Sequence, residues 1–263
     1  MILRYCFGLL LPLVTVMPQP ACMAATLISP PGLSLAASET TAVLTVTNQR
    51  DVAQRYRIAA FAWSQTKADP EVLTTSRDIA ATPADLTLAA HETGHVTVTL
   101  RPRPRQQAER AYRVRIAELP RAEREPDETI AITTTVTVPV FVAPLNPVHR
   151  ADIAGSRLRN GRLGFSVRNR GNVHAFIRTL SAKGGRPDGG QSFAIARPGW
   201  YLLAGQSLDV RATVSRPDCQ ASTGILVRAE FQDGTGTETP LPFDRRDCGN
   251  ATETGFPAPV LLP

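Results

Sequence analysis

The chain has 263 residues, of which 43% are hydrophobic and 20% are charged, a composition that excludes an intrinsically disordered protein. Four cysteines are too few for a small disulfide scaffold, and 22 prolines with 18 glycines argue against long helices. The net charge of +6 comes from 29 basic residues, of which 27 are arginine, and it raises the question of a polyanionic partner.

The first segment, residues 1–25, has the pattern of a secretory signal peptide. Arg4 precedes an apolar stretch over residues 7–17, and small residues follow that stretch. The stretch is too short to span a bilayer. Cys22 raises the alternative of a lipoprotein, but the residues before it lack the aliphatic side chain that such a site prefers. We therefore expect cleavage near residue 25 and an exported chain.

Five segments after the signal alternate between apolar and other residues, with the period of a β-strand. They are residues 42–48, 56–63, 95–100, 111–118 and 129–142. A proline-rich linker follows at residues 143–147, and the same pattern then returns. The later predicted strands are residues 161–169, 173–180, 206–214 and 224–231.

Short strands that are separated by Pro and Gly clusters are typical of β-sandwiches. The sequence therefore predicts an all-β fold with two immunoglobulin-like β-sandwich domains in tandem. The N-terminal domain is expected at residues 26–145 and the C-terminal domain at 146–250. Residues 251–263 form a Pro-rich tail that we expect to be loose.

The positive charge is confined to the second of these domains. Residues 26–145 hold 13 basic and 13 acidic residues, whereas residues 146–263 hold 15 basic and 10 acidic residues. The basic residues are not interleaved with the aromatic residues that stack on nucleic-acid bases. A nucleic-acid partner is therefore not expected, while contact with an acidic surface remains an alternative.

Residues 91–95 read H-E-T-G-H and match the zinc-protease motif letter for letter. That chemistry requires a helix, because two imidazoles four residues apart must share one face. Gly94 interrupts the motif, and a predicted strand begins at His95. We therefore predict a polar turn between two strands, with no metal site.

The sequence lacks a nucleophile elbow, a phosphate loop and a dinucleotide fingerprint, so no catalytic residue or cofactor is predicted and the chain is not expected to be an enzyme. Loss of the signal leaves two cysteines, Cys219 and Cys248. An even pair in an exported protein favours a disulfide over two free buried thiols.

The long predicted strand at residues 129–142 is the segment of greatest interest. Ile130, Ile132, Thr134 and Val136 fall on one face of it. A core strand is the ordinary interpretation. The strand, however, follows a charged loop with prolines, and its start is long enough to extend beyond its own sheet. Such an edge can pair with another chain through main-chain hydrogen bonds.

Seven segments share an order and spacing with a known family: residues 29–35, 44–48, 62–65, 81–83, 86–90, 112–120 and 139–144. Through them the sequence resembles the periplasmic chaperones that assemble pili, and it is most similar to their archaic, spore-coat-type branch. The resemblance covers nearly the whole mature chain.

The resemblance implies donor-strand complementation, in which the chaperone lends a strand to a pilus subunit that lacks one and then delivers the subunit to an outer-membrane usher. It implies pilus subunits and an usher as partners. By position, the lending residues are Ile130, Ile132, Thr134 and Val136. The hydroxyl of Thr134 makes it the weaker apolar contact.

The resemblance also implies an interdomain charge network and a basic anchor for the subunit's terminal carboxylate. Glu109 and Asp233 match the acidic positions of the network, but Ala143 replaces its arginine. Gly32 and Pro139 occupy the usual positions of the anchor. Because arginine binds carboxylates with two hydrogen bonds, the nominated anchors are Arg113 and, in reserve, Arg115.

Two other classes of function are kept as alternatives. A secreted, adhesive Ig-like protein would share the predicted fold, and a hydrolase on a β scaffold would need a constellation of catalytic residues that the sequence does not display. A chaperone differs from an adhesive protein in that it forms a soluble 1:1 complex with a subunit.

Overall fold

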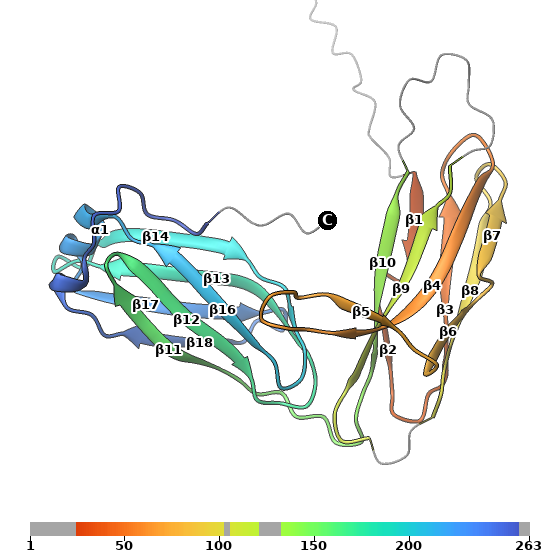
Figure 1. Ribbon diagram of the computed structural model, residues 1–263, viewed down its shortest axis with the longest axis horizontal. Helices are drawn as coiled ribbons and strands as arrows, with labels where there is room; N and C mark the ends of the chain where they lie inside the picture. Colours follow the sequence, from red (N-terminus) through yellow and green to blue (C-terminus); the bar gives the residue numbers. More distant parts are fainter. Residues whose placement is uncertain (1–24, 103–105, 121–132, 258–263) are drawn as a thin grey trace, which may run out of the picture.

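The computed structural model describes residues 25–102, 106–120 and 133–257, and almost all of their regular structure is β-strand. The strands form two β-sandwiches that follow each other along the chain (Figure 1). The predicted all-β class with two immunoglobulin-like domains is confirmed. Apart from Ala25, the predicted signal peptide lies outside the described residues.

The first sandwich consists of two sheets, with the strand orders β1-β3-β8-β6 and β2-β10-β9-β4-β5, and β7 pairs with β4. Its strands are β1 Thr26–Ser29, β2 Leu33–Leu35, β3 Thr41–Asn48, β4 Gln54–Ser64, β5 Val72–Thr75, β6 Ile79–Thr82, β7 Asp85–Leu88, β8 Thr93–Leu100, β9 Arg110–Glu118 and β10 Thr135–Val142.

The core of this sandwich follows directly from the alternation in the sequence. Every second residue of β3 and β8 points inward, and these residues meet the inward residues of β9 and β10. Each fully buried aliphatic side chain contributes about 1.5–3 kcal/mol. The innermost residues are Leu44, Val46, Val96, Val98, Val114, Ile116, Val138 and Val140.

The second sandwich has the strand orders β11-β12-β16 and β14-β13-β17-β18, and β15 pairs with β13. Its strands are β11 Ala151–Arg159, β12 Arg162–Asn169, β13 Ala175–Gly185, β14 Gln191–Pro198, β15 Tyr201–Leu202, β16 Ser207–Thr213, β17 Gly224–Phe231 and β18 Gly236–Leu241. It also contains the short helix α1 Arg216–Ala221 and the 3-10 turn η1 Arg245–Asp247.

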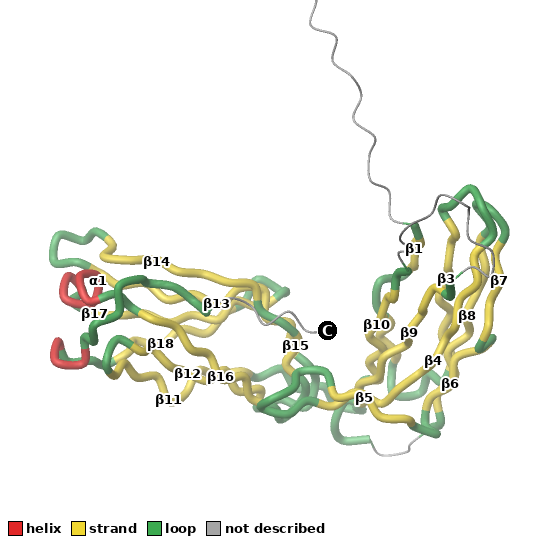
Figure 2. Tube along the Cα trace, turned by 45° about the horizontal axis from the view of Figure 1, so that its top comes forward, coloured by secondary structure: helices red, strands yellow, loops and turns green. Residues whose placement is uncertain are grey.

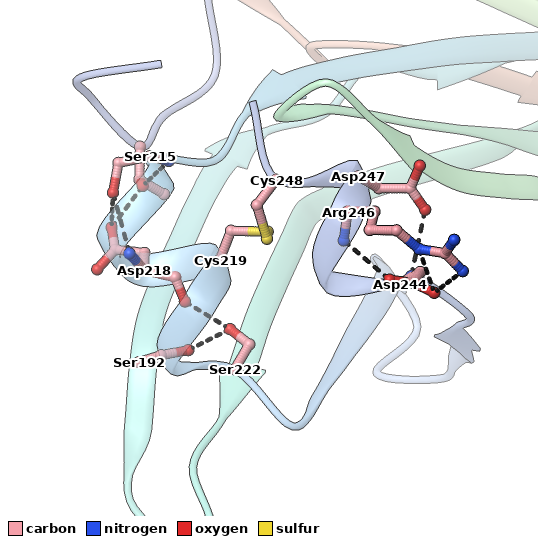
Figure 3. The surroundings of a disulfide bond; sticks show 10 residues. Ser192, Ser215, Asp218, Cys219, Ser222, Asp244, Arg246, Asp247 and Cys248 are labelled. Atoms are coloured by element: carbon pink, nitrogen blue, oxygen red, sulfur yellow. Dashed lines mark hydrogen bonds and ion pairs between the residues drawn. A yellow bond between two sulfur atoms is a disulfide. The ribbon is translucent and has the colours of Figure 1, made fainter. Parts of the chain in front are cut away.

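A disulfide between Cys219 of α1 and Cys248 ties these two short helical segments together (Figure 3). Cys219 is fully buried in the core of the second sandwich, and the two Cα atoms are 5.6 Å apart. The pair closes a loop across 29 positions of sequence, so it contributes about 3–4 kcal/mol by restricting the unfolded chain.

Most of the predicted strands are present, and the differences have local causes. The prediction missed nine of the described strands. Six of them have four residues or fewer, too few to display alternation: β1, β2, β5, β6, β7 and β15. The other three are β11, β14 and β18. Residues 91–95 form a turn and the start of β8, as predicted, and His91 has a positive φ of 59°. Of the predicted strand at 129–142, the described part contains β10.

The two sandwiches meet where the hairpin between β4 and β5 reaches β15 (Figure 2). This hairpin belongs to the first sandwich, but its loop reaches the near end of the second one (Figure 1). Among the described helices, none has the length and apolar character needed to cross a membrane.

Candidate functional site

Strand β10 has a partner along one edge and is largely open along the other. It pairs with β9 over its whole length, from Thr135 to Val142. On its other edge it pairs with β2 only from Val140 to Val142. Residues 135–139 thus present an edge without a strand partner in the described part of the chain, and such an edge can accept a strand from another protein.

The beginning of β10 is held by the buried carboxylate of Glu118. Its Oε2 accepts a hydrogen bond from the backbone N–H of Thr134 at 3.1 Å and forms an ion pair with Arg50 at 2.9 Å. Its Oε1 accepts a hydrogen bond from Thr26 at 2.6 Å. Glu118 therefore fixes the point at which the chain enters β10 from residues 121–132, which are outside the described residues.

The predicted lending residues are divided by that boundary. Thr134 and Val136 are described and are both half-buried, and Val136 packs against the core of the first sandwich. Ile130 and Ile132 lie outside the described residues.

Gly32 and Pro139 pack against each other at the point where β2 reaches β10. A Cβ atom at position 32 would lie 3.3 Å from Cγ of Pro139, which is tighter than ordinary packing. The close approach disfavours a larger side chain at position 32. Neither residue carries a charge, so a cationic anchor of the kind that the resemblance implies would have to lie on another strand.

Arg113 lies opposite Pro139 on β9 and is buried, with 3% of its surface exposed. Its Nε forms an ion pair with Oε1 of Glu71 at 2.7 Å, and its Cζ lies 3.7 Å from the ring centroid of Trp63. Burial lowers the pKa of the guanidinium, while the charge of Glu71 opposes that shift. Arg113 is thus buried and paired with Glu71, while its Nε and Nη2 have no hydrogen-bond partner within the described residues.

Arg115 lies two residues further along the same face of β9, opposite Thr137, and is exposed. Its Cζ lies 5.0 Å from the ring centroid of Phe61 on β4. No carboxylate pairs with it within the described residues. Arg115 therefore presents an unpaired guanidinium on the strand next to β10, across β10 from its open edge.

The interface between the sandwiches, which we call the junction, is built around three buried apolar side chains. Trp63 and Phe141 belong to the first sandwich, and Leu203 belongs to the second. Tyr201 packs edge-on against Trp63, with ring centroids 5.5 Å apart. Because Phe141 lies at the end of β10, this strand is buried on both faces at the junction.

The side chain of Glu109 crosses the junction and contacts His174. Oε2 of Glu109 accepts hydrogen bonds from the backbone N–H of His174 at 2.7 Å and contacts its Nδ1 at 2.8 Å. The imidazole of His174 stacks on Phe141, with centroids 3.6 Å apart. Asp233 instead accepts hydrogen bonds from Thr235, which lower its pKa.

Gln65, which directly follows β4, makes a paired contact across the junction. Its Nε2 donates to the carbonyl oxygen of Tyr201 at 2.9 Å, and its Oε1 accepts from the N–H of Leu203 at 2.9 Å. The side-chain amide thereby pairs with backbone as a neighbouring strand would.

Sequence reasoning missed the contributions of Gln65, Glu118 and His174. Within the described residues, no group of three or more His, Cys, Asp and Glu side chains is placed to hold a metal ion. The site is a strand edge beside a two-domain junction.

Comparison with known families identifies the first sandwich. Residues 28–147 match the family model described as "Pili and flagellar-assembly chaperone, PapD N-terminal domain". The first sandwich is therefore similar to the N-terminal domain of the pili and flagellar-assembly chaperones. A search of curated proteins finds no match.

Solved structures of chaperones share the whole two-domain fold. The chaperone–tip subunit complex CsuC–CsuE, from the archaic chaperone–usher Csu pili of Acinetobacter baumannii, matches with a TM-score of 0.57 and 15% identity, over 83% of this chain and 98% of that one. The class 5 fimbriae chaperone CfaA matches with a TM-score of 0.53 and 14% identity, over 83% and 99%. At these identities the likeness establishes the fold.

Proposed function

We propose that the protein is a periplasmic, non-enzymatic chaperone that binds pilus subunits by donor-strand complementation and passes them to an outer-membrane usher. The observation that carries the proposal is the open edge of β10 over residues 135–139, in a chain whose N-terminal domain is similar to that of the pilus chaperones. Structures similar in fold include chaperone complexes with a pilin or a tip subunit.

In this proposal the strand is lent by Ile130, Ile132, Thr134 and Val136. The alternation of these side chains matches the spacing of pockets along a groove that lacks a strand, because every second side chain of a strand faces the same side. The two isoleucines supply most of the apolar contact, since each contributes about 1.5–3 kcal/mol when it is fully buried.

We further propose Arg115 as the anchor of the subunit's terminal carboxylate, in preference to Arg113. Arg115 is exposed and unpaired beside β10, whereas Arg113 is buried and paired with Glu71. An exposed guanidinium can take a carboxylate with two parallel hydrogen bonds. Both candidates are arginines, so the greater solvent exposure of Arg115 is what favours it as the anchor.

The strand-lending proposal is tested by co-expressing the chaperone with the pilus subunit from the same gene cluster and measuring the soluble 1:1 complex. Ile132→Asp should abolish capture, because a carboxylate cannot be buried in an apolar groove without a large cost. Ile132→Val is the matched control and should retain capture. Full capture by Ile132→Asp would overturn the proposal, and an adhesive protein would form no such complex.

The anchor is tested in the same assay with Arg115→Ala, which should weaken capture about tenfold or more, since a charge-assisted pair contributes about 1.5–3 kcal/mol. Arg57→Ala is the control, because Arg57 is another exposed arginine of the same sheet and is paired with Asp85. If both variants capture the subunit equally well, Arg115 is not the anchor.

The proposed domain limits are residues 26–145 and 146–250, with a signal peptide at 1–25 and a tail at 251–263. Strand β10 ends at Val142 and β11 begins at Ala151, so the limit at 145 falls between the two sandwiches. N-terminal sequencing of the secreted protein tests the cleavage site.

A further inference from the structure

Four arginines occupy one end of the outer face of the β11-β12-β16 sheet. In one row Arg157 and Arg211 stand on either side of Gly164, and in the next row Arg159 lies directly opposite Arg162. Residues that are opposite each other in adjacent strands share a face. The inward residues of these strands, Leu158, Leu163 and Ala212, are buried, so the four arginines all point outward.

We call this set of four residues the arginine face. No acidic side chain of the described residues neutralises its charges. All four residues are exposed, and no ion pair or side-chain hydrogen bond of theirs occurs in the described structure. The nearest acid on this face, Asp209 in the adjoining row, accepts a hydrogen bond from Ser166. Like charges opposite each other destabilise a sheet, so the pair Arg159 and Arg162 is unfavourable in the isolated chain.

Because Gly164 has no side chain, the space above the backbone between Arg157 and Arg211 is open. A Cβ atom at this position would meet a single heavy atom within 4 Å, the carbonyl oxygen of Val210 at 3.9 Å. Packing therefore does not require glycine here. Adjacent strands are about 4.8 Å apart, so Arg157 and Arg211 flank a gap of about 10 Å between their backbones, which is wide enough for a phosphate group.

The arginine face is also rigid. The two-residue turn Asn160–Gly161 has positive φ angles of 50° and 71°, as a tight hairpin requires. The N–H of Gly161 donates to the carbonyl of Asp247 at 2.8 Å, next to Cys248 of the disulfide. The covalent link therefore holds the end of the sheet from which Arg159 and Arg162 project.

We propose that the arginine face binds the phosphate groups of an anionic membrane surface. Four charges on the same face of a rigid sheet can contact a flat membrane surface at the same time. Each guanidinium can donate two parallel hydrogen bonds to one phosphate group. None of the exposed large apolar side chains in the described residues lies on β11, β12 or β16, so the contact is adsorption without insertion. The choice of a membrane rests on the proposed export of the chain.

The test is co-sedimentation of the full mature chain with vesicles of phosphatidylethanolamine and phosphatidylglycerol (7:3) and with phosphatidylcholine vesicles. Binding should occur only to the anionic vesicles and should be lost when NaCl rises from 0.05 to 0.3 M, because the contact is electrostatic. Arg159→Gln with Arg211→Gln should weaken binding at least tenfold. Gly164→Glu should weaken binding as well, by placing a carboxylate between Arg157 and Arg211.

The matched control is Arg178→Gln with Arg228→Gln, which removes the same charge from the other sheet, where both arginines are paired with glutamates. It should bind vesicles nearly as well as the wild type, and thermal melting should show all variants folded. Equal binding of the two double variants, or binding to polyglutamate but not to vesicles, overturns the proposal. Subunit capture, measured separately, is expected to be unchanged, so a failure here leaves the proposed function standing.

Discussion

At the scale of single residues, the junction depends on one carboxylate that accepts two hydrogen bonds from the opposite domain. Glu109 has 7% of its side chain exposed, so its charge has lost most of its water. Hydrogen bonds from the backbone N–H and the ring of His174 replace the lost water. A buried carboxylate that is satisfied in this way contributes more than an exposed one.

Glu109→Ala should therefore lower the free energy of unfolding by about 1–3 kcal/mol, because it leaves the N–H of His174 without its acceptor. Urea denaturation followed by circular dichroism measures the change. Asp233→Ala is the control and should have a much smaller effect, since Asp233 is exposed and its side-chain hydrogen bonds come from Thr235 of its own loop. Equal effects would show that Glu109 is not the dominant contact.

At the scale of elements, the β4–β5 hairpin links the two domains through the amide of Gln65. The amide completes the backbone pairing of Tyr201 and Leu203 in the second sandwich. The two hydrogen bonds of Gln65 span 136 and 138 positions of sequence, so they join elements that no local sequence pattern connects.

Gln65→Ala should cost about 1–3 kcal/mol and increase the range of angles between the sandwiches, because one backbone donor and one acceptor lose their partners. Small-angle scattering would detect the second effect as a larger spread of dimensions. Ser64→Ala, at the exposed neighbouring position, should change neither quantity. A scattering profile of Gln65→Ala that is identical to wild type would contradict this role.

The disulfide is the other element-scale constraint, and it acts within the second sandwich alone. Cys219→Ser with Cys248→Ser should lower the stability of that sandwich by about 3–4 kcal/mol. Thermal melting with and without a reductant provides the measurement. Reductant should shift the wild type and leave the double variant unchanged, and a shift in both would point to an effect unrelated to this bond.

At the scale of the whole molecule, the junction decides whether two sandwiches unfold as one unit. Phe141 belongs to the strand that carries the candidate site, and it contacts Trp63, His174 and Tyr201. Interfaces of this kind couple domains only while their apolar centre is intact.

Phe141→Ala should uncouple the domains, so that calorimetry records two transitions in place of one. Truncation of a buried phenylalanine costs about 3–5 kcal/mol, and here part of that cost falls on the interface. Phe193→Ala is the control, since Phe193 is similarly buried, at 7% exposure against 5%, but lies in the core of the second sandwich. Separate transitions in the control alone would contradict the role of Phe141.

The fold could be predicted from sequence because alternation is a local property of strands such as β3 and β9. The same alternation correctly placed Arg113 and Arg115 on one face. It could not separate them, because Arg113 is covered by Trp63 and Glu71 and, across the junction, by Tyr201, none of which is near it in sequence. His174 and Gln65 escaped prediction for the same reason, since their roles exist only once the two domains meet.

Pro139 gives the candidate edge a fixed length. Proline has no N–H to donate, and from Val140 onward β2 already occupies that side of β10. A strand that pairs with the open edge must therefore stop at this residue, whatever its sequence. This stop sets the register of the incoming chain: the chain ends at the row in which Pro139 pairs with Arg113, and β10 lies between its last residue and β9.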